Sequence, residues 1–319
     1  MTGIVDLHTH SWTSVDQLGT ELAGRLRGRQ VEQWGQLDGG IEAHDVAMDC
    51  VRASVIIGFR SELLGADIPI EYLADIVSRC PDRRIGFAGI DPMTSDALRQ
   101  VDRALELGLS GVALAPACQA FHPTHSRAML VYERCAANGL PVFVLQQEPL
   151  PASARMEFGH PAAWDEVART FPDLPIVLSS LGFPWIDETF VLLSKHDRVF
   201  ATISGVAQRP WQLYGALLTA SHLGVMDKLL FGSGFPLNTP ARCIESMYSV
   251  NAYSHGTQMP TISRSSIRAI VERDSLALLG VHAELDARTP DPIDDDDAND
   301  RARPAALRPS PTPRPTEQP

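Results

Sequence analysis

The 319-residue sequence has few cysteines and few basic residues. Its five cysteines are odd in number, scattered and without a C-x-x-C pair, so neither a disulfide framework nor a zinc ribbon is expected. The 27 Lys and Arg stand against 39 Asp and Glu, which gives a net charge of −12. Nucleic acids and anionic membrane surfaces attract clustered basic residues, so neither is an expected partner.

Long apolar runs are missing as well. No stretch is long enough to span a bilayer, and no basic-then-apolar signal segment precedes the first apolar run. Together with the cysteine usage, these absences predict a protein of the reducing cytoplasm. The hydrophobic content of 44% is enough for one large core, and α/β barrels commonly reach this length as a single domain.

The first apolar run, residues 4–10, ends in two histidines one residue apart, His8 and His10. Side chains alternate between the two faces of a strand, so both imidazoles are expected to point the same way at its C-terminal end. This is a geometry for binding a divalent metal ion. The alternative is a buried first strand that the two histidines merely cap.

Residues 11–42 form a predicted loop insertion with one or two helical turns, because Ser11 to Gly40 is rich in Gln, Arg and Gly with sparse apolar positions. In a barrel enzyme an insertion after the first strand lies over the mouth of the site. Trp12 and Trp34 could contact a ligand there. Alternatively, they pack the insertion onto the barrel.

Beyond this insertion, apolar β-branched runs alternate with segments of helical spacing. With residues 4–10, the expected strands are 53–59, 84–90, 111–115, 141–145, 174–178, 199–203 and 228–232. The expected helices are 43–51, 70–79, a helix capped by Thr94 or Ser95 through 107, 126–138, 161–171, 186–195, 211–223, 241–250 and 263–279. Eight strand–helix units predict an α/β fold, a closed (β/α)8 TIM barrel, as one domain over residues 1–285. A doubly wound sheet is disfavoured, since no G-x-G-x-x-G follows a strand.

Residues 286–319 differ in composition from the rest. An acidic run, Asp294 to Asp297, precedes a stretch dominated by Pro, Arg, Ala and Thr. Such a composition cannot offset the entropy cost of ordering, so a disordered tail is predicted. The acidic run could recruit a basic partner, or the tail could be solvated and without function.

The order of motifs resembles the amidohydrolase superfamily, in the amidohydrolase-2 branch related to aminocarboxymuconate-semialdehyde decarboxylase. The matching stretches are Asp6-Leu-His-Thr-His10, Gly108-Leu-Ser-Gly-Val112, Gln119-Ala-Phe-His-Pro123, Gly139-Leu-Pro-Val142, Phe171-Pro-Asp-Leu174, Leu181-Gly-Phe-Pro-Trp185, Leu230-Phe-Gly-Ser233 and Phe235-Pro236. The resemblance implies one or two divalent metals. They are held by the His-x-His, a His ending strand five, usually a His ending strand six, and an Asp ending strand eight that also takes a proton from metal-bound water.

Most of these ligand positions depart from the family pattern. Strand five ends in Leu145, or in Gln146 if the register slips by one. Strand six has Ser180 in place of His, and strand eight has Gly234 in place of Asp. The strand-four Lys of some members is Ala113. A catalytic zinc usually needs about three protein ligands, so the resemblance implies an eroded site that holds no divalent metal, or holds zinc or manganese weakly.

Three interpretations follow. In the first, the barrel is impaired or non-catalytic and binds a small molecule or a partner, with candidate pocket residues Trp12, Gln146, Gln147, Ser180 and Trp185. In the second, it is an active metal-dependent hydrolase or decarboxylase with a rearranged site that uses His8, His10 and Glu148. In that case Glu148 is the candidate catalytic carboxylate, and further groups facing the mouth are expected from His122, His125 and Asp91.

In the third interpretation, the barrel is a structural or oligomeric scaffold whose Pro-rich tail mediates contacts. The resemblance also implies a possible homodimer, because many relatives are dimers. The substrate is not specified by any of these motifs, since the family acts on amides, esters, lactones and carboxylated rings.

Overall fold

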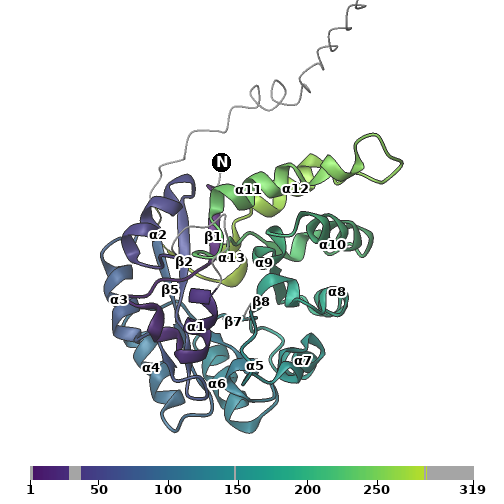
Figure 1. Cartoon of the computed structure of the whole chain (residues 1–319). Helices are drawn as coiled ribbons and strands as arrows, with labels where there is room; N and C mark the ends of the chain where they lie inside the picture. Colours follow the sequence, from purple (N-terminus) through teal and green to yellow (C-terminus); the bar gives the residue numbers. More distant parts are fainter. Residues whose placement is uncertain (1–2, 29–36, 147–148, 284, 286–319) are drawn as a thin grey trace, which may run out of the picture.

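The structure is a computed structural model that describes residues 3–28, 37–146, 149–283 and 285. Eight parallel strands form one sheet in the order β1-β2-β5-β6-β7-β8-β9-β10 (Figure 1). They are β1 (Val5–Thr9), β2 (Ala53–Ile57), β5 (Arg84–Gly89), β6 (Gly111–Leu114), β7 (Val142–Val144), β8 (Ile176–Leu178), β9 (Val199–Thr202) and β10 (Leu229–Leu230). The predicted TIM barrel is confirmed.

The first and last strands join through backbone hydrogen bonds beyond the short β10. The amide of Leu7 donates to the carbonyl of Phe231 at 3.2 Å, and the amide of Gly234 donates to the carbonyl of His8 at 2.8 Å. The amide of His10 donates to the carbonyl of Phe235 at 2.9 Å. The strand end that carries the two histidines is therefore held against the end of β10.

Helices surround the strands (Figure 1). They are α2 (Ile41–Ala47), α3 (Ile70–Ser78), α4 (Ala97–Glu106), α6 (Ser126–Ala137), α7 (Trp164–Thr170), α8 (Ile186–Lys195), α10 (Pro210–His222), α11 (Pro240–Tyr248), α12 (Arg264–Val271) and α13 (Ser275–Leu279). Within the described residues, no helix combines the length and apolar character that crossing a bilayer requires.

Two predicted helix boundaries are wrong. The hydroxyl of Thr94 donates to the carbonyl of Asp91 at 2.9 Å, and α4 begins only after Asp96. The expected helix 263–279 is divided into α12 and α13, because the side chain of Asp274 accepts from the amide of Ala277 and starts a new helix. The sequence analysis also missed α5 (Pro116–Gln119), α9 (Ser204–Ala207) and a hairpin of β3 (Arg60–Ser61) and β4 (Ala66–Asp67).

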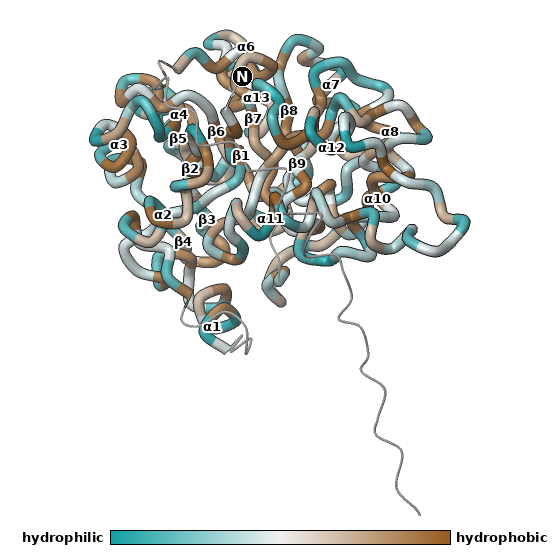
Figure 2. The backbone as a smooth tube through the Cα atoms, turned by 90° about the horizontal axis from the view of Figure 1, so that it is seen from above, coloured by the Kyte–Doolittle hydropathy of each residue, from teal (hydrophilic) through white to brown (hydrophobic). Residues whose placement is uncertain are grey.

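Apolar side chains form two cores on opposite sides of the strands. In Figure 2, hydrophobic residues are brown along the central strands and on the helices around them. Alternate strand positions fill the barrel interior, among them Val55, Ile57, Phe87, Phe143 and Phe200. The intervening positions pack against the helices. Because both faces of a parallel sheet are covered, the strands read as continuous apolar runs, which is why they are easily found in the sequence.

The insertion after β1 contains more helix than predicted: the 3-10 helix η1 (Val15–Leu18) and α1 (Thr20–Gly28). Gly19 lies so close to the β3–β4 hairpin that a Cβ there would be 2.1 Å from the carbonyl oxygen of Leu64. On the other side, the carboxylate of Glu21 accepts hydrogen bonds from the amide and hydroxyl of Ser153, at 3.3 and 2.6 Å. The insertion therefore bridges the loops that follow β2 and β7. Trp34 lies outside the described residues.

His44 of α2 makes the fold sensitive to acid. Its Nε2 lies 3.1 Å from the hydroxyl of Thr9, and burial lowers its pKa to about 4. The unfolded chain therefore binds the proton more tightly, and stability is lost as the pH falls from 6.5 toward 4. Over this pH range, the free energy of unfolding should fall by up to about 3 kcal/mol more for the wild type than for His44→Gln. Urea unfolding at several pH values measures the difference, and parallel pH profiles for the two proteins would contradict it.

Candidate functional site

An irregularity in β1 turns His8 and His10 into the barrel mouth. Asp6 pairs with Ser54 of β2, but Thr9 already pairs with Ile56, so the register shifts between them. Strict alternation would point His8 away from the interior, since Leu7 lies in the inner core. Bulges commonly redirect side chains next to active sites. As a result, Leu7, His8 and His10 all face inward.

The two imidazoles contact each other. Their Nε2 atoms lie 3.2 Å apart, and His10 Nδ1 lies 2.8 Å from the carbonyl oxygen of Ile57. A carbonyl only accepts, so His10 carries its proton on Nδ1, and its Nε2 accepts from His8 Nε2. His8 Nδ1 then accepts from the hydroxyl of Ser204 at 2.8 Å. Burial lowers the pKa of His8 well below its ordinary value and that of His10 to about 4, so both are neutral near pH 7.

The pair meets one requirement of a metal site and fails another. Two nitrogens on one tetrahedral zinc lie roughly 3.3 Å apart, close to the observed Nε2 separation of 3.2 Å. However, the described residues contain no group of three or more His, Cys, Asp or Glu that could hold a metal ion. These residues alone do not fit a three-ligand catalytic zinc site. Glu148 and Gln147 lie outside the described residues.

Ser180, which follows β8, begins a strained turn. Ser180, Leu181 and Gly182 all have positive φ, at 53°, 52° and 64°. A non-glycine residue in this region costs on the order of 1–2 kcal/mol. The amide of Ser180 donates to Ser204 Oγ and the Ser180 hydroxyl accepts from the amide of Gly205, both at 3.2 Å. These bonds hold Ser180 beside Ser204, whose hydroxyl is the hydrogen-bond partner of His8.

A cavity of about 90 Å³ lies over the histidine pair. Trp12, Gln146 and Ser180 line it together with His8 and His10. The other described lining residues are Leu18, Leu22, Leu26, Phe59, Leu145, Gly205, Gln208, Arg209, Gly234, Pro236 and Leu237. The first three come from the insertion: Leu18 ends η1, and Leu22 and Leu26 lie four residues apart on one face of α1. The insertion therefore covers the cavity with leucine side chains.

Arg209, between α9 and α10, is the one formally charged side chain among the described residues that line this cavity. Its guanidinium carbon lies 4.2 Å from the centre of the Phe183 ring, a cation–π contact that orients the guanidinium plane. Sequence reasoning missed Arg209 and Gln208, because the short helix α9 was not expected. The signal available was an arginine seven residues after the end of β9, on the loop side where barrel sites form.

Other candidates lie elsewhere. The Trp185 ring packs on His160 at 5.0 Å, and Trp185 is not among the described residues that line the cavity. His125 caps α6 by accepting from the amide of Arg127. His122 Nδ1 lies 2.8 Å from the Thr124 hydroxyl. The carboxylate of Asp91 accepts from the amides of Glu62 and Met93, at 2.8 and 3.0 Å.

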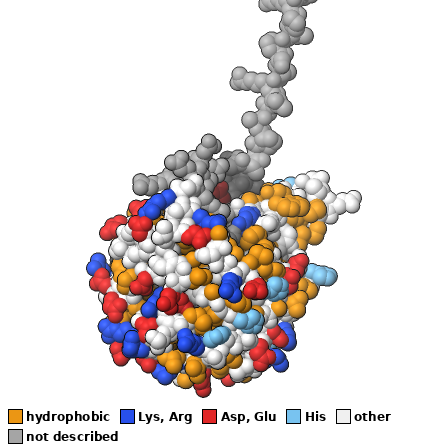
Figure 3. Space-filling view, turned by 60° about the horizontal axis from the view of Figure 1, so that its bottom comes forward, with side chains coloured by type: hydrophobic (Ala, Val, Ile, Leu, Met, Phe, Trp, Pro, Cys, Tyr) orange, Lys and Arg blue, Asp and Glu red, His pale blue; other side chains and the backbone are white. Residues whose placement is uncertain are grey.

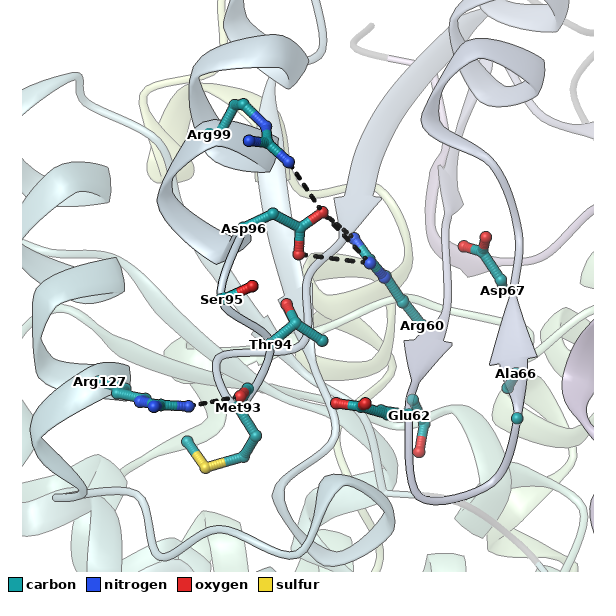
Figure 4. A pocket seen from close by; sticks show the side chains of 12 residues that line it. Arg60, Glu62, Ala66, Asp67, Met93, Thr94, Ser95, Asp96, Arg99 and Arg127 are labelled. Carbon is teal, nitrogen blue, oxygen red and sulfur yellow. Dashed lines mark hydrogen bonds and ion pairs between the residues drawn. The ribbon is translucent and has the colours of Figure 1, made fainter.

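A wider hollow, of about 760 Å³, lies beside the β3–β4 hairpin (Figure 4). Its charged groups largely pair with one another: Arg60 and Arg99 contact Asp96, at 3.3 and 3.7 Å. Arg127 donates to the carbonyl of Met93 at 2.6 Å. This hollow contains neither member of the histidine pair, so the smaller cavity is the better candidate site.

A family model described as amidohydrolase, of the amidohydrolase-2 type, matches residues 5–252, which is more than three quarters of the chain. The chain belongs to the amidohydrolase family. This amidohydrolase-2 protein therefore has a family-type barrel with its histidine pair at the mouth. A search of curated protein sequences finds no match.

Solved structures share the fold of this amidohydrolase. An uncharacterised TIM-barrel protein from Bordetella bronchiseptica aligns with a TM-score of 0.67 at 19% identity, covering 87% of this chain and 99% of its own. A probable 2-pyrone-4,6-dicarboxylic acid hydrolase from Acinetobacter baumannii, with citric acid bound, gives 0.60 at 13% identity over 88% and 100%. A dihydroxybenzoic acid decarboxylase from Polaromonas sp. JS666, with manganese and 2-nitroresorcinol, gives 0.57 at 17% identity over 88% and 97%.

Proposed function

We propose that this amidohydrolase-family protein binds a small organic carboxylate over His8 and His10 and does not turn it over by the metal-water route of its family. The observation that carries the proposal is the cavity lining: one guanidinium, that of Arg209, among leucine and aromatic walls. Arginine binds carboxylates with two parallel hydrogen bonds. The neutral histidines add no charge, so the described residues of the lining carry a formal charge of +1 in a chain of −12.

The apolar walls restrict the ligand to one with an apolar or aromatic body. Leu18, Leu22 and Leu26 offer no hydrogen-bonding side-chain groups, whereas Gln146 and Gln208 add amide groups to the lining. Two of the structurally similar proteins are described as acting on a dihydroxybenzoic acid and on a pyrone dicarboxylic acid. Ring carboxylates are therefore the ligand class that we propose for this chain.

The absence of turnover rests on the donor set. At the ends of strands five, six and eight, the family pattern has a metal ligand or a general base. This chain has Leu145, Ser180 and Gly234 at those positions. Leucine and glycine side chains cannot coordinate a metal or accept a proton from water, and neutral serine is a poor ligand. Losing a general base typically costs about 10²–10⁴-fold in rate, in addition to the loss of metal affinity.

Calorimetric titration with 2,6-dihydroxybenzoate tests the proposal. We expect saturable binding at about one site per chain. After incubation with Mn²⁺ or Zn²⁺, a decarboxylation assay should give no more product than a buffer blank. Product formation above that blank would contradict the claim of a non-catalytic site, and the absence of saturable binding of this or related ring carboxylates would contradict the ligand class.

The second candidate is an active hydrolase or decarboxylase with a rearranged metal site. The observation in its favour is the 3.2 Å separation of the two Nε2 atoms. Each Nδ1 also lies 2.8 Å from an oxygen, that of Ser204 or Ile57, which could accept a hydrogen bond from an Nδ1–H if both Nε2 atoms bound a metal. Under this candidate, Glu148 supplies the missing carboxylate. This candidate predicts metal-dependent turnover by the wild type and no turnover by Glu148→Gln.

A further inference from the structure

Two serine hydroxyls connect the cavity with the Nδ1 atom of His8. Ser180 lines the cavity, and its Oγ lies 3.2 Å from the Oγ of Ser204. Ser204 is buried, and its Oγ lies 2.8 Å from His8 Nδ1. Because Ser204 donates its proton to His8, the hydrogen bond between the two serines is donated by Ser180. We call this path, from Ser180 through Ser204 to His8 Nδ1, the relay.

The backbone at Ser180 has the strain that often accompanies a nucleophilic serine. Ser180 comes two residues after the end of β8 and has a φ of 53°, and Gly182 follows it by two residues. In hydrolases with a G-x-S-x-G motif, a sharp and strained turn after a strand exposes the serine hydroxyl. Such strain persists where the surrounding structure maintains it, and it clusters at functional sites. Binding of a carboxylate by Arg209 does not explain this strain.

Donors for an oxyanion line the same cavity. The amide of Gly205 donates to Ser180 Oγ at 3.2 Å, and both Gly205 and Arg209 belong to the cavity lining. Fixed N–H groups of this kind stabilise the negative oxygen that forms when a hydroxyl attacks an ester carbonyl. The cavity thus brings together a serine, a path for its proton and donors for the developing charge.

We propose that Ser180 is the nucleophile of an acyl-transfer site that hydrolyses small aryl esters. Ser180 Oγ bonds to the carbonyl carbon, its proton passes to Ser204, and the proton of Ser204 passes to His8 Nδ1. The bond to the phenol oxygen then breaks, the phenol takes a proton back along the relay, and the acyl group stays on Ser180. Water releases the acid and restores the Ser180 hydroxyl, so ester and water give acid and phenol.

The cavity walls and the relay together select this substrate class. Leu22, Leu26 and Phe59 offer apolar surface to an aromatic ring. A neutral imidazole in apolar surroundings is a weak base, so the leaving group must itself be weakly basic. Phenols, with a pKa near 10, meet this requirement far better than aliphatic alcohols do.

This reaction differs from decarboxylation and from the metal-water route, which the proposed function excludes. It uses the same cavity as the proposed ring carboxylate but does not depend on the binding of that ligand. Acylation is measured by mass and by phenol release, whereas carboxylate binding is measured by calorimetry. Either inference can therefore fail without the other.

Labelling of the full chain with a small dialkyl fluorophosphate tests the nucleophile. This reagent bonds to an activated serine oxygen with loss of fluoride. We expect one label per chain, on the Ser180 peptide, and none at this position in Ser180→Ala. Ser194→Ala is the matched control and should be labelled as the wild type is, because Ser194 on α8 is exposed and lies outside the cavity lining. An unlabelled wild type, or a label only at other residues, would overturn the proposal.

Release of 4-nitrophenol from 4-nitrophenyl acetate tests the relay. Exposed histidines also react with aryl esters, and histidine side chains lie on the surface drawn in Figure 3, so Ser180→Ala supplies the background rate. Above that background, Ser204→Ala should be at least about 10²-fold slower than the wild type, and Ser204→Thr should recover most of the loss. Thr202→Val should keep most of the wild-type rate, because Thr202 Oγ1 lies 3.1 Å from Ser204 Oγ but outside the relay.

Two results of this assay would contradict the acyl-transfer site. One is a wild-type rate no higher than that of Ser180→Ala. The other is equal slowing by Ser204→Ala and Thr202→Val, which would mean that the buried hydroxyls only support the turn. Thermal unfolding of each variant shows whether it is folded, and the labelling of the wild type requires no variant.

Discussion

Replacing Arg209 with methionine is expected to weaken the binding of 2,6-dihydroxybenzoate by about 10–100-fold, because a hydrogen bond to a charged group contributes about 1.5–3 kcal/mol. Methionine keeps much of the length and apolar stem of arginine but lacks the guanidinium, including its cation–π contact with Phe183. The loss of affinity therefore reports the guanidinium. Isothermal titration of the two proteins under identical salt measures the difference.

Two controls isolate the carboxylate interaction. Arg99→Met removes a guanidinium that is 80% exposed in the wider hollow and should leave binding unchanged. Resorcinol has the ring and hydroxyl groups of the acid without its carboxylate, so its affinity should be similar for wild type and Arg209→Met. If Arg209→Met binds the acid as tightly as the wild type, the carboxylate does not lie at this guanidinium.

The substitution Gly182→Ala is expected to destabilise the fold by at least about 3 kcal/mol, which combines backbone strain and overpacking. Gly182 has a φ of 64°, and a Cβ there would lie 2.1 Å from Thr189 Oγ1 and 3.1 Å from a ring carbon of Pro161. Thr189 is buried and its hydroxyl already donates to the carbonyl of Trp185. Relaxing this clash moves the turn that holds Ser180, so carboxylate affinity should fall as well. Denaturant unfolding measures the stability.

Gly139→Ala is the matched control. Gly139 has nearly the same φ, 65°, but no atom lies within 4 Å of its added Cβ. Only the backbone strain remains there, which costs on the order of 1 kcal/mol. Equal losses for the two variants would mean that the contacts of Gly182 with Thr189 and Pro161 contribute nothing.

The barrel could be predicted from the sequence because its strands are buried on both faces. Runs such as residues 53–57 and 84–89 are fully buried and read as apolar segments between turn residues. The helix boundaries at Asp96 and Asp274 depend on single local hydrogen bonds and packing, which periodicity does not contain. The hairpin β3–β4 has only two residues in each strand, too short for any pattern to reveal.

The site was predicted in part. His8 and His10 share a face as expected, but through a register shift that alternation alone does not predict. Trp12, Gln146 and Ser180 line the cavity. Arg209 reaches it from the segment between α9 and α10, and the leucines of α1 reach it because the insertion folds back over the mouth. That long-range arrangement depends on contacts such as the one from Glu21 to Ser153, which lie far apart in sequence.

The metal content of the purified full chain tests the central claim most directly. The chain would be incubated with Zn²⁺ or Mn²⁺, desalted and analysed beside a His8→Ala/His10→Ala double variant. Two histidines without a third ligand should retain far less than about one equivalent, and the variant should differ little from the wild type. About one equivalent in the wild type that the double variant lacks would contradict the incomplete metal site and favour a centre completed by Glu148.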